Sequence, residues 1–143
     1  CSWDASGTYL AVAHNTSPYV TVYQRSGSTL TKLADPATLP ASSAQGCAWD
    51  SSGTYLAVAH GTSPYITVYQ RSGSTLTKLA NPLPLPGSDA FGCSFSASAG
   101  LLAVAHTSAP YITVYKNLNY DEATQFAAPL VSAGPNLAAY IKA

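Results

Sequence analysis

Thr54-Tyr55-Leu56-Ala57-Val58-Ala59-His60 occurs letter for letter at residues 8–14 and returns, with a looser start, at residues 101–106. Cys1, Cys47 and Cys93 recur with the same period of 46 residues. The first two copies are identical over most of their length, and the third diverges after Tyr115. A repeat of this length is typical of proteins built from one supersecondary unit that stacks on its neighbours.

Each copy has the pattern of short strands separated by turns. In residues 54–60 side chains alternate, so that Leu56, Val58 and His60 lie on one face and Tyr55, Ala57 and Ala59 on the other. In the second copy we expect strands at residues 47–49, 54–60, 65–69 and 75–79, with turns at residues 50–53, 61–64 and 71–74.

Four short strands per repeat predict an all-β, β-propeller-like fold. The expected units are three four-stranded blades followed by the start of a further strand, at residues 1–46, 47–92, 93–135 and 136–143. Because closed propellers use about four to eight blades, three blades would leave two open flanks. Three outcomes are possible: further blades in a longer chain, a ring of several chains, or stacking on another protein. The beginning at Cys1, inside a repeat, and the lack of any Met favour the first.

The stretch from Trp49 to Ala59 resembles the strand–turn–strand of WD-repeat-like propellers, and Ile66-Thr67-Val68-Tyr69 resembles their third strand. Two features depart from that family. The Gly-His pair before the first strand is missing, and Tyr stands where the family has Trp, at Tyr23, Tyr69 and Tyr115. We therefore do not expect the family's buried Asp-His-Ser-Trp network, and we expect apolar packing to hold each blade together.

The wording of the repeat is also similar to repeats of tailed-bacteriophage virion proteins and related prophage genes. This resemblance implies a structural protein located in the virion, and no catalytic motif accompanies it.

Composition excludes several classes of function. Charged residues make up 8% of the chain and the net charge is zero, whereas binding to nucleic acid or anionic lipid requires clustered Lys and Arg. No apolar run approaches the length of a membrane span. We therefore expect neither a nucleic-acid partner nor membrane insertion.

Two residue types repeat once per blade and could carry chemistry. A ring of histidines, His14, His60 and His106, could bind metal or sense pH, but equivalent positions around a propeller are too far apart to share a metal. We expect one structural His per blade, bonded to a backbone carbonyl. The cysteines are odd in number, which opposes internal disulfides, so we expect thiols buried on the inner strand.

Carboxylates give no catalytic pair. Asp4 and Asp50 lie in turns, where the third copy has Ser96. Asp121 and Glu122 fall in a polar loop that we expect to be solvated. With no nucleophile elbow, phosphate loop or dinucleotide fingerprint, we predict a non-enzymatic protein with no cofactor or metal.

Tyrosine is unusually abundant, at 10 of 143 residues. Tyrosines can form aromatic contact surfaces or pack across strands. The best surface candidates each follow a Pro turn, and they are Tyr19, Tyr65 and Tyr111.

The sequence therefore predicts a structural or interaction module of a bacteriophage particle, such as a capsid decoration, tail or fibre protein. Its partners would be other virion proteins or copies of itself. One alternative is a host-surface or glycan-binding module that uses the three tyrosines. Another is a cellular WD-repeat-like scaffold, and a third is a propeller enzyme whose catalytic groups lie outside this segment.

Overall fold

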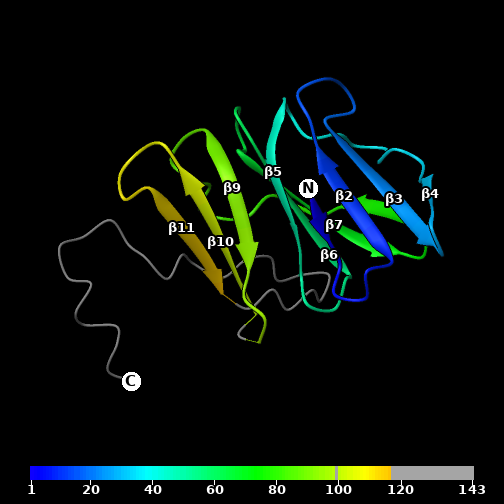
Figure 1. Ribbon diagram of the computed structural model, residues 1–143. Helices are drawn as coiled ribbons and strands as arrows, with labels where there is room; N and C mark the ends of the chain where they lie inside the picture. Colours follow the sequence, from blue (N-terminus) through cyan, green and yellow to red (C-terminus); the bar gives the residue numbers. More distant parts are fainter. Residues whose placement is uncertain (99, 117–143) are drawn as a thin grey trace.

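The chain forms antiparallel sheets that follow one another in sequence order (Figure 1). The computed structural model describes residues 1–98 and 100–116. The regular secondary structure of these residues consists of β-strands alone. The strands are β1 (Ser2–Trp3), β2 (Tyr9–Ala13), β3 (Val20–Ser26), β4 (Thr29–Lys32), β5 (Ala44–Trp49), β6 (Tyr55–His60), β7 (Ile66–Ser72), β8 (Thr75–Lys78), β9 (Ala90–Phe95), β10 (Leu101–His106) and β11 (Ile112–Lys116).

Each sheet is a simple meander, in the orders β1-β2-β3-β4, β5-β6-β7-β8 and β9-β10-β11. We call these sheets the first, second and third blade. The all-β prediction is confirmed. The fourth strand expected in the third blade, and the further strand expected at residues 136–143, lie outside the described residues.

The strand limits differ from the prediction at two places. The inner strands β5 and β9 begin at Ala44 and Ala90, before the cysteine at which we placed each boundary. The third strand of the second blade continues to Ser72, because Arg71 pairs with Leu76 in a tight hairpin that turns at Gly73. Polar side chains are compatible with pairing here because β8 is the outer edge of the sheet.

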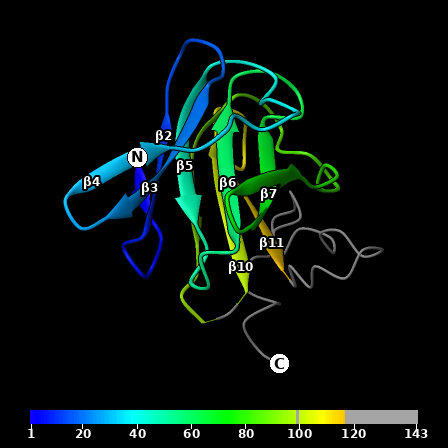
Figure 2. The same ribbon diagram turned by 90° about the vertical axis from the view of Figure 1, so that its right-hand side faces the viewer.

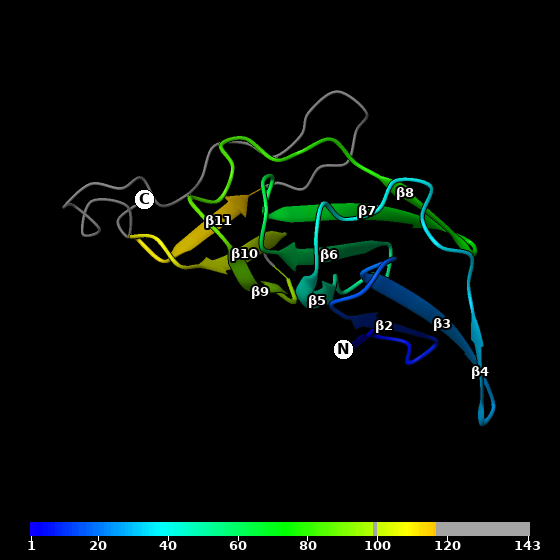
Figure 3. The same cartoon turned by 90° about the horizontal axis from the view of Figure 1, so that it is seen from above.

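The hydrophobic core lies between the blades, and the second blade is covered on both faces. Leu56 and Val58 belong to the cluster shared with the first blade, whereas Ala57 and Ala59 belong to the cluster shared with the third. Figure 3 shows the second blade between the other two. The alternation predicted for residues 54–60 is therefore confirmed. Full burial of a Leu or Val side chain contributes about 1.5–3 kcal/mol, so packing between blades dominates stability.

The blades are twisted, as Figure 2 shows for β4, which lies strongly inclined to β2. Twist of this kind is the normal consequence of L-residue geometry in strands. It turns the outer strands away from those of the neighbouring blade, while the inner strands β5 and β9 stay close. Gly46 in β5 shows how close the two strands are, because a Cβ atom there would lie 3.0 Å from the carbonyl oxygen of Phe91 in β9.

Candidate functional site

The turn between the second and third strand has the same geometry in each blade. In the second blade the amide of Tyr65 donates to the carbonyl of Thr62 at 2.7 Å, and the amide of His60 donates to the carbonyl of Tyr65 at 2.9 Å. The Pro before the Tyr follows a cis peptide bond, and the Tyr has a φ of 66°. Few non-glycine residues adopt this left-handed conformation. We call residues 14–19, 60–65 and 106–111 the Pro-Tyr turns.

The three candidate tyrosines lie in different environments. Tyr19 packs against the cluster between the first and second blades, and Tyr65 packs against the cluster between the second and third. Tyr111 is 64% exposed. The structure thus presents Tyr111 as an open aromatic ring, and the role of all three as a contact surface stays a prediction.

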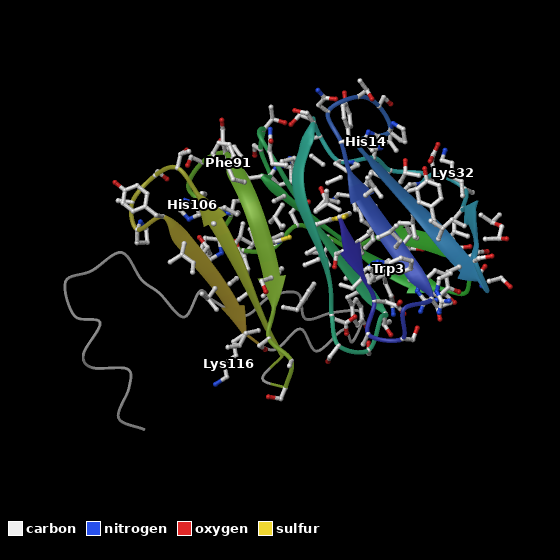
Figure 4. All side chains as sticks on the ribbon, viewed as in Figure 1. Trp3, His14, Lys32, Phe91, His106 and Lys116 are labelled. Carbon is white, nitrogen blue, oxygen red and sulfur yellow. The ribbon has the colours of Figure 1, made fainter. Side chains whose placement is uncertain are left out.

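The Pro-Tyr turns lie at one end of the blades and contain no Lys, Arg, Asp or Glu. Phe91, which is 55% exposed, lies at this end together with His14 and His106, whereas Lys116 lies at the opposite end (Figure 4). This end therefore carries small polar side chains and exposed aromatic rings, and the exposed Asp89 lies beside the third turn, where its backbone carbonyl accepts from the amide of Thr107 at 3.2 Å.

The repeated histidines bond inside their own blade. The Nε2 atom of His60 lies 2.9 Å from the hydroxyl of Thr67, and the same pair recurs at 3.0 Å for His14–Thr21 and at 2.9 Å for His106–Thr113. We expected a backbone carbonyl as partner, whereas the strand register places a threonine hydroxyl within reach of the Nε2 atom. Burial lowers the pKa of His60; a backbone hydrogen bond at Thr62 opposes this shift, and the charge of Lys78 adds to it. Among the described residues no three His, Cys, Asp or Glu side chains gather as metal ligands.

The cysteines of the second and third blades contact the preceding blade. The thiol of Cys47 donates to the carbonyl of Ala11 at 3.5 Å, and that of Cys93 donates to the carbonyl of Ala57 at 3.5 Å. Burial raises the pKa of Cys93 to about 12. These thiols are partly buried on the inner strands, whereas Cys1 is exposed, and all three are free. A thiol with a raised pKa is a poor nucleophile.

The repeated aspartates stabilise turns. One carboxylate oxygen of Asp50 accepts hydrogen bonds from the amides of Thr54 and Tyr55, at 2.9 and 2.7 Å. Asp4 makes the equivalent bonds at 2.8 Å. In the third blade Ser96 accepts from the amide of Leu101 at 3.0 Å, which explains how a neutral side chain can replace the carboxylate. Asp121 and Glu122 lie outside the described residues.

The tyrosines of the third strand hold the connectors between blades, a role that sequence reasoning missed. The hydroxyl of Tyr69 donates to the carbonyl of Thr38 at 2.9 Å, and that of Tyr115 donates to the carbonyl of Pro84 at 2.8 Å. Both rings are fully buried. Buried polar bonds therefore add to the apolar packing that we expected to hold the blades alone. The signal was present in the sequence, because Tyr carries a hydroxyl at a position where the WD-repeat family has Trp.

A small hollow lies between the inner turns of the second and third blades. Its volume is about 130 Å³, and it is lined by Asp50, Phe95, Ser96 and their neighbours. Pockets that bind small molecules usually measure about 300–1,000 Å³, so this hollow is too small for a typical ligand.

Residues 1–98 and 100–116 contain no helix long and apolar enough to cross a lipid bilayer.

No protein-family model and no curated protein matches the chain. Solved structures do resemble it. A putative 6-phosphogluconolactonase from Bacteroides fragilis matches 90% of this chain and 36% of its own, with 16% identity and a TM-score of 0.70. The β-propeller domain of Cps50 (Swd1) from Myceliophteria thermophila matches 80% of this chain and 38% of its own, with 14% identity and a TM-score of 0.63. The WD40 repeats of RRP9 match 91% of this chain and 37% of their own, with 16% identity and a TM-score of 0.62.

These likenesses confirm the predicted β-propeller-like fold and its similarity to WD-repeat propellers. At such low identity they establish the fold alone. The chain spans little more than a third of each of these chains.

Proposed function

We propose that this chain is a non-enzymatic interaction module that presents a rigid contact surface to another protein. One observation carries the proposal. The repeated side chains that could have acted in catalysis or metal binding instead make hydrogen bonds that stabilise the fold. The histidines bond to threonines, the aspartates hold turns, and two of the cysteines bond to the preceding blade. The likeness to WD40 domains establishes the fold, and one fold can carry many functions. The bonding of these side chains within the fold is therefore what carries the proposal.

The contact surface is the end formed by the Pro-Tyr turns. It combines exposed rings at Tyr111 and Phe91 with small polar side chains, and Asp89 supplies a charge beside the third turn. Protein interfaces favour aromatic residues and are depleted in charge at their centres. The rigid strands on either side would hold these turns in place, so little conformational entropy is lost on binding.

The protein belongs, in this proposal, to a bacteriophage particle, as a capsid decoration, tail or fibre component. The wording of the repeat supports this assignment. A cellular WD-repeat-like scaffold is the competing assignment, and the likeness to Cps50 and RRP9 supports it.

Antibodies against the chain would distinguish these assignments. Lysates of the source culture would be separated on density gradients, and the fractions probed by immunoblot and by immunogold electron microscopy. Label on banded particles is expected for a virion component. Recovery in the soluble cell fraction alone would favour the cellular scaffold.

A second candidate function is glycan binding, favoured by the 64% exposure of the Tyr111 ring. Aromatic rings can serve as stacking platforms for apolar sugar faces. Glycan-array binding by the native chain that is lost in Tyr111→Ala would support it. Binding that survives this substitution would exclude Tyr111 as the platform.

A further inference from the structure

The segment that leads from the second blade into β9 differs from its counterpart more than any other part of the repeat. Six of the ten differences between residues 1–46 and residues 47–92 fall between residues 81 and 91. The differing pairs are Asp35 and Asn81, Ala37 and Leu83, Thr38 and Pro84, Ala41 and Gly87, Ser43 and Asp89, and Gln45 and Phe91. Because the strands that build the core stay nearly the same, this segment can serve a contact of its own. We call residues 87–91 the Asp89 corner.

Phe91 occupies a β-bulge that turns its side chain out of the sheet. Across the sheet Ala90 pairs with His106, and Gly92 pairs with the adjacent Ala105. Phe91 is therefore an extra residue without a partner on β10, and it lies at the end of the blades that carries the Pro-Tyr turns (Figure 4). Its side chain is 55% exposed, whereas Ala90 is completely buried. Bulges commonly redirect a side chain in this way beside functional sites.

The second blade shows that this outward direction belongs to the strand itself. There the pairing of β5 with β6 skips Gln45 in the same way. Gln45 is exposed although β9 packs beside β5. The exposure of Phe91 is therefore a property of the bulge and does not depend on what lies beside the third blade.

Asp89 brings an unpaired charge to the same corner. It is exposed, and no Lys, Arg or His among residues 1–98 and 100–116 forms an ion pair with it. By contrast, Lys32 binds the carboxylate of Asp35, in the preceding connector, at 2.8 Å. Asp89 and Phe91 are two residues apart, so their Cα atoms are at most about 7 Å from each other. One long basic side chain can therefore reach the carboxylate and the ring together.

The third Pro-Tyr turn holds the Asp89 corner in place. The hydroxyl of Ser88 accepts a hydrogen bond from the amide of Ser108 at 2.8 Å and lies 2.8 Å from the hydroxyl of Thr107. The amide of Thr107 donates to the carbonyl of Asp89 at 3.2 Å. Gly87 permits this close approach, because a Cβ atom there would lie 2.5 Å from the hydroxyl oxygen of Ser108.

The second blade lacks this support. Gly61 stands in place of Thr107 and has no hydroxyl to offer. The buried hydroxyl of Ser42, the counterpart of Ser88, has no hydrogen-bond partner among the described residues. The Asp89 corner is therefore the better fixed of the two, and a fixed site loses less conformational entropy on binding.

We propose that the Asp89 corner binds a Lys or Arg side chain of the partner protein, so that a basic residue determines which partner the contact surface accepts. This inference rests on the proposed function and names the chemistry of its partner. The carboxylate of Asp89 would accept charge-assisted hydrogen bonds from the cation, and the face of the Phe91 ring would attract the same charge. Aromatic residues and Arg are enriched at protein interfaces and carry much of the binding energy there.

Selection of peptides from a random display library, with the native chain as bait, tests this inference. The selected peptides should share a Lys or Arg beside apolar residues. Selection on Asp89→Asn should lose the preference for the basic residue. Asp35→Asn is the matched control, because it removes the same charge from the preceding connector, at a position where the repeat also holds Asn81. This control should keep the preference.

Calorimetry with one selected peptide measures the two contacts separately. Asp89→Asn should raise the dissociation constant about two- to fivefold, and less at high salt, as for other exposed ion pairs. Phe91→Gln introduces the residue found at Gln45 and should raise it about tenfold. Norleucine in place of the basic residue of the peptide should weaken binding to the native chain more than binding to Asp89→Asn. Circular dichroism confirms that each variant is folded.

The outcomes separate this inference from the function on which it rests. Selected peptides without a basic residue, or a basic preference that survives Asp89→Asn, would overturn the inference and leave the contact surface standing. A chain that selects no peptide would contradict the contact surface itself, and the inference with it.

Discussion

The guanidinium carbon of Arg71 lies 3.9 Å from the centroid of the Tyr9 ring, across the junction between the second and first blades. The same group lies 5.9 Å from the Trp49 ring. Arg71 is also fixed by hydrogen bonds to the carbonyls of Gly53 and Gly73. It therefore links its own hairpins to the neighbouring blade.

Arg71→Ala should lower the free energy of unfolding by about 1–2 kcal/mol, since a cation–π contact contributes about 0.5–2 kcal/mol and hydrogen bonds are lost with it. Denaturant unfolding followed by tryptophan fluorescence measures the change. Arg25→Ala is the matched control, because Arg25 makes the same backbone bonds without the aromatic contact in the described chain. Equal losses in the two variants would show that the ring contact contributes nothing.

Gly46→Ala tests the close approach of the inner strands. The added methyl group would lie 3.0 Å from the carbonyl oxygen of Phe91 and 3.2 Å from the Cα atom of Gly92. Backbone atoms cannot move away as a flexible side chain can, so we expect a loss of about 1–3 kcal/mol in the free energy of unfolding. Thermal unfolding monitored by circular dichroism would detect it.

Gly92→Ala provides the contrast within the same chain, because no described atom lies within 4 Å of a Cβ atom at Gly92. This substitution should be neutral, or slightly stabilising through the unfolded state. A similar loss for both glycines would mean that the cost arises from strand conformation and not from contact between blades.

The strands were predictable because period-two alternation is a local property of the chain. Burial was not, since it depends on which neighbour covers each face. Leu10 and Leu56 stand in identical stretches of sequence, yet Leu56 is completely buried and Leu10 is only partly covered. Sequence reasoning therefore located the sheets but did not show which copies of a repeated residue would be open.

The polar pairs were harder to predict, because they depend on register across the turns. His60 meets Thr67 only because the Pro-Tyr turn places Ala59 opposite Ile66. That turn requires a positive φ at Tyr65, which a sequence gives no reason to expect at a non-glycine residue. The candidate tyrosines could be named from the sequence, but their different exposures could not.

Tyr69→Phe should cost about 1 kcal/mol, because it removes the hydroxyl that donates to Thr38 and leaves a carbonyl of the connector without this donor. The ring itself stays, so the apolar packing is unchanged. Tyr23→Phe is the control, since Tyr23 is the half-buried equivalent of Tyr69 in the first blade. Hydrogen exchange should show faster exchange in residues 34–43 for Tyr69→Phe, and unchanged rates there would contradict the role of the bond.

The stability of the fold should decline on mild acidification, and His60 should carry part of that decline. Burial lowers its pKa in the folded chain, whereas an unfolded chain titrates at about 6.5. The unfolded state therefore takes up a proton first, so this contribution to stability is present above about pH 6.5 and is lost as the pH falls. The slope of stability against pH that His60 contributes cannot exceed about 1.4 kcal/mol per pH unit.

Urea unfolding of the native chain and of His60→Gln between about pH 5 and 7.5 measures this slope. The variant is less stable at pH 7.5, where its bond to Thr67 is altered, but its stability should vary less with pH. Parallel curves for the two proteins would show that His60 is not the titrating group.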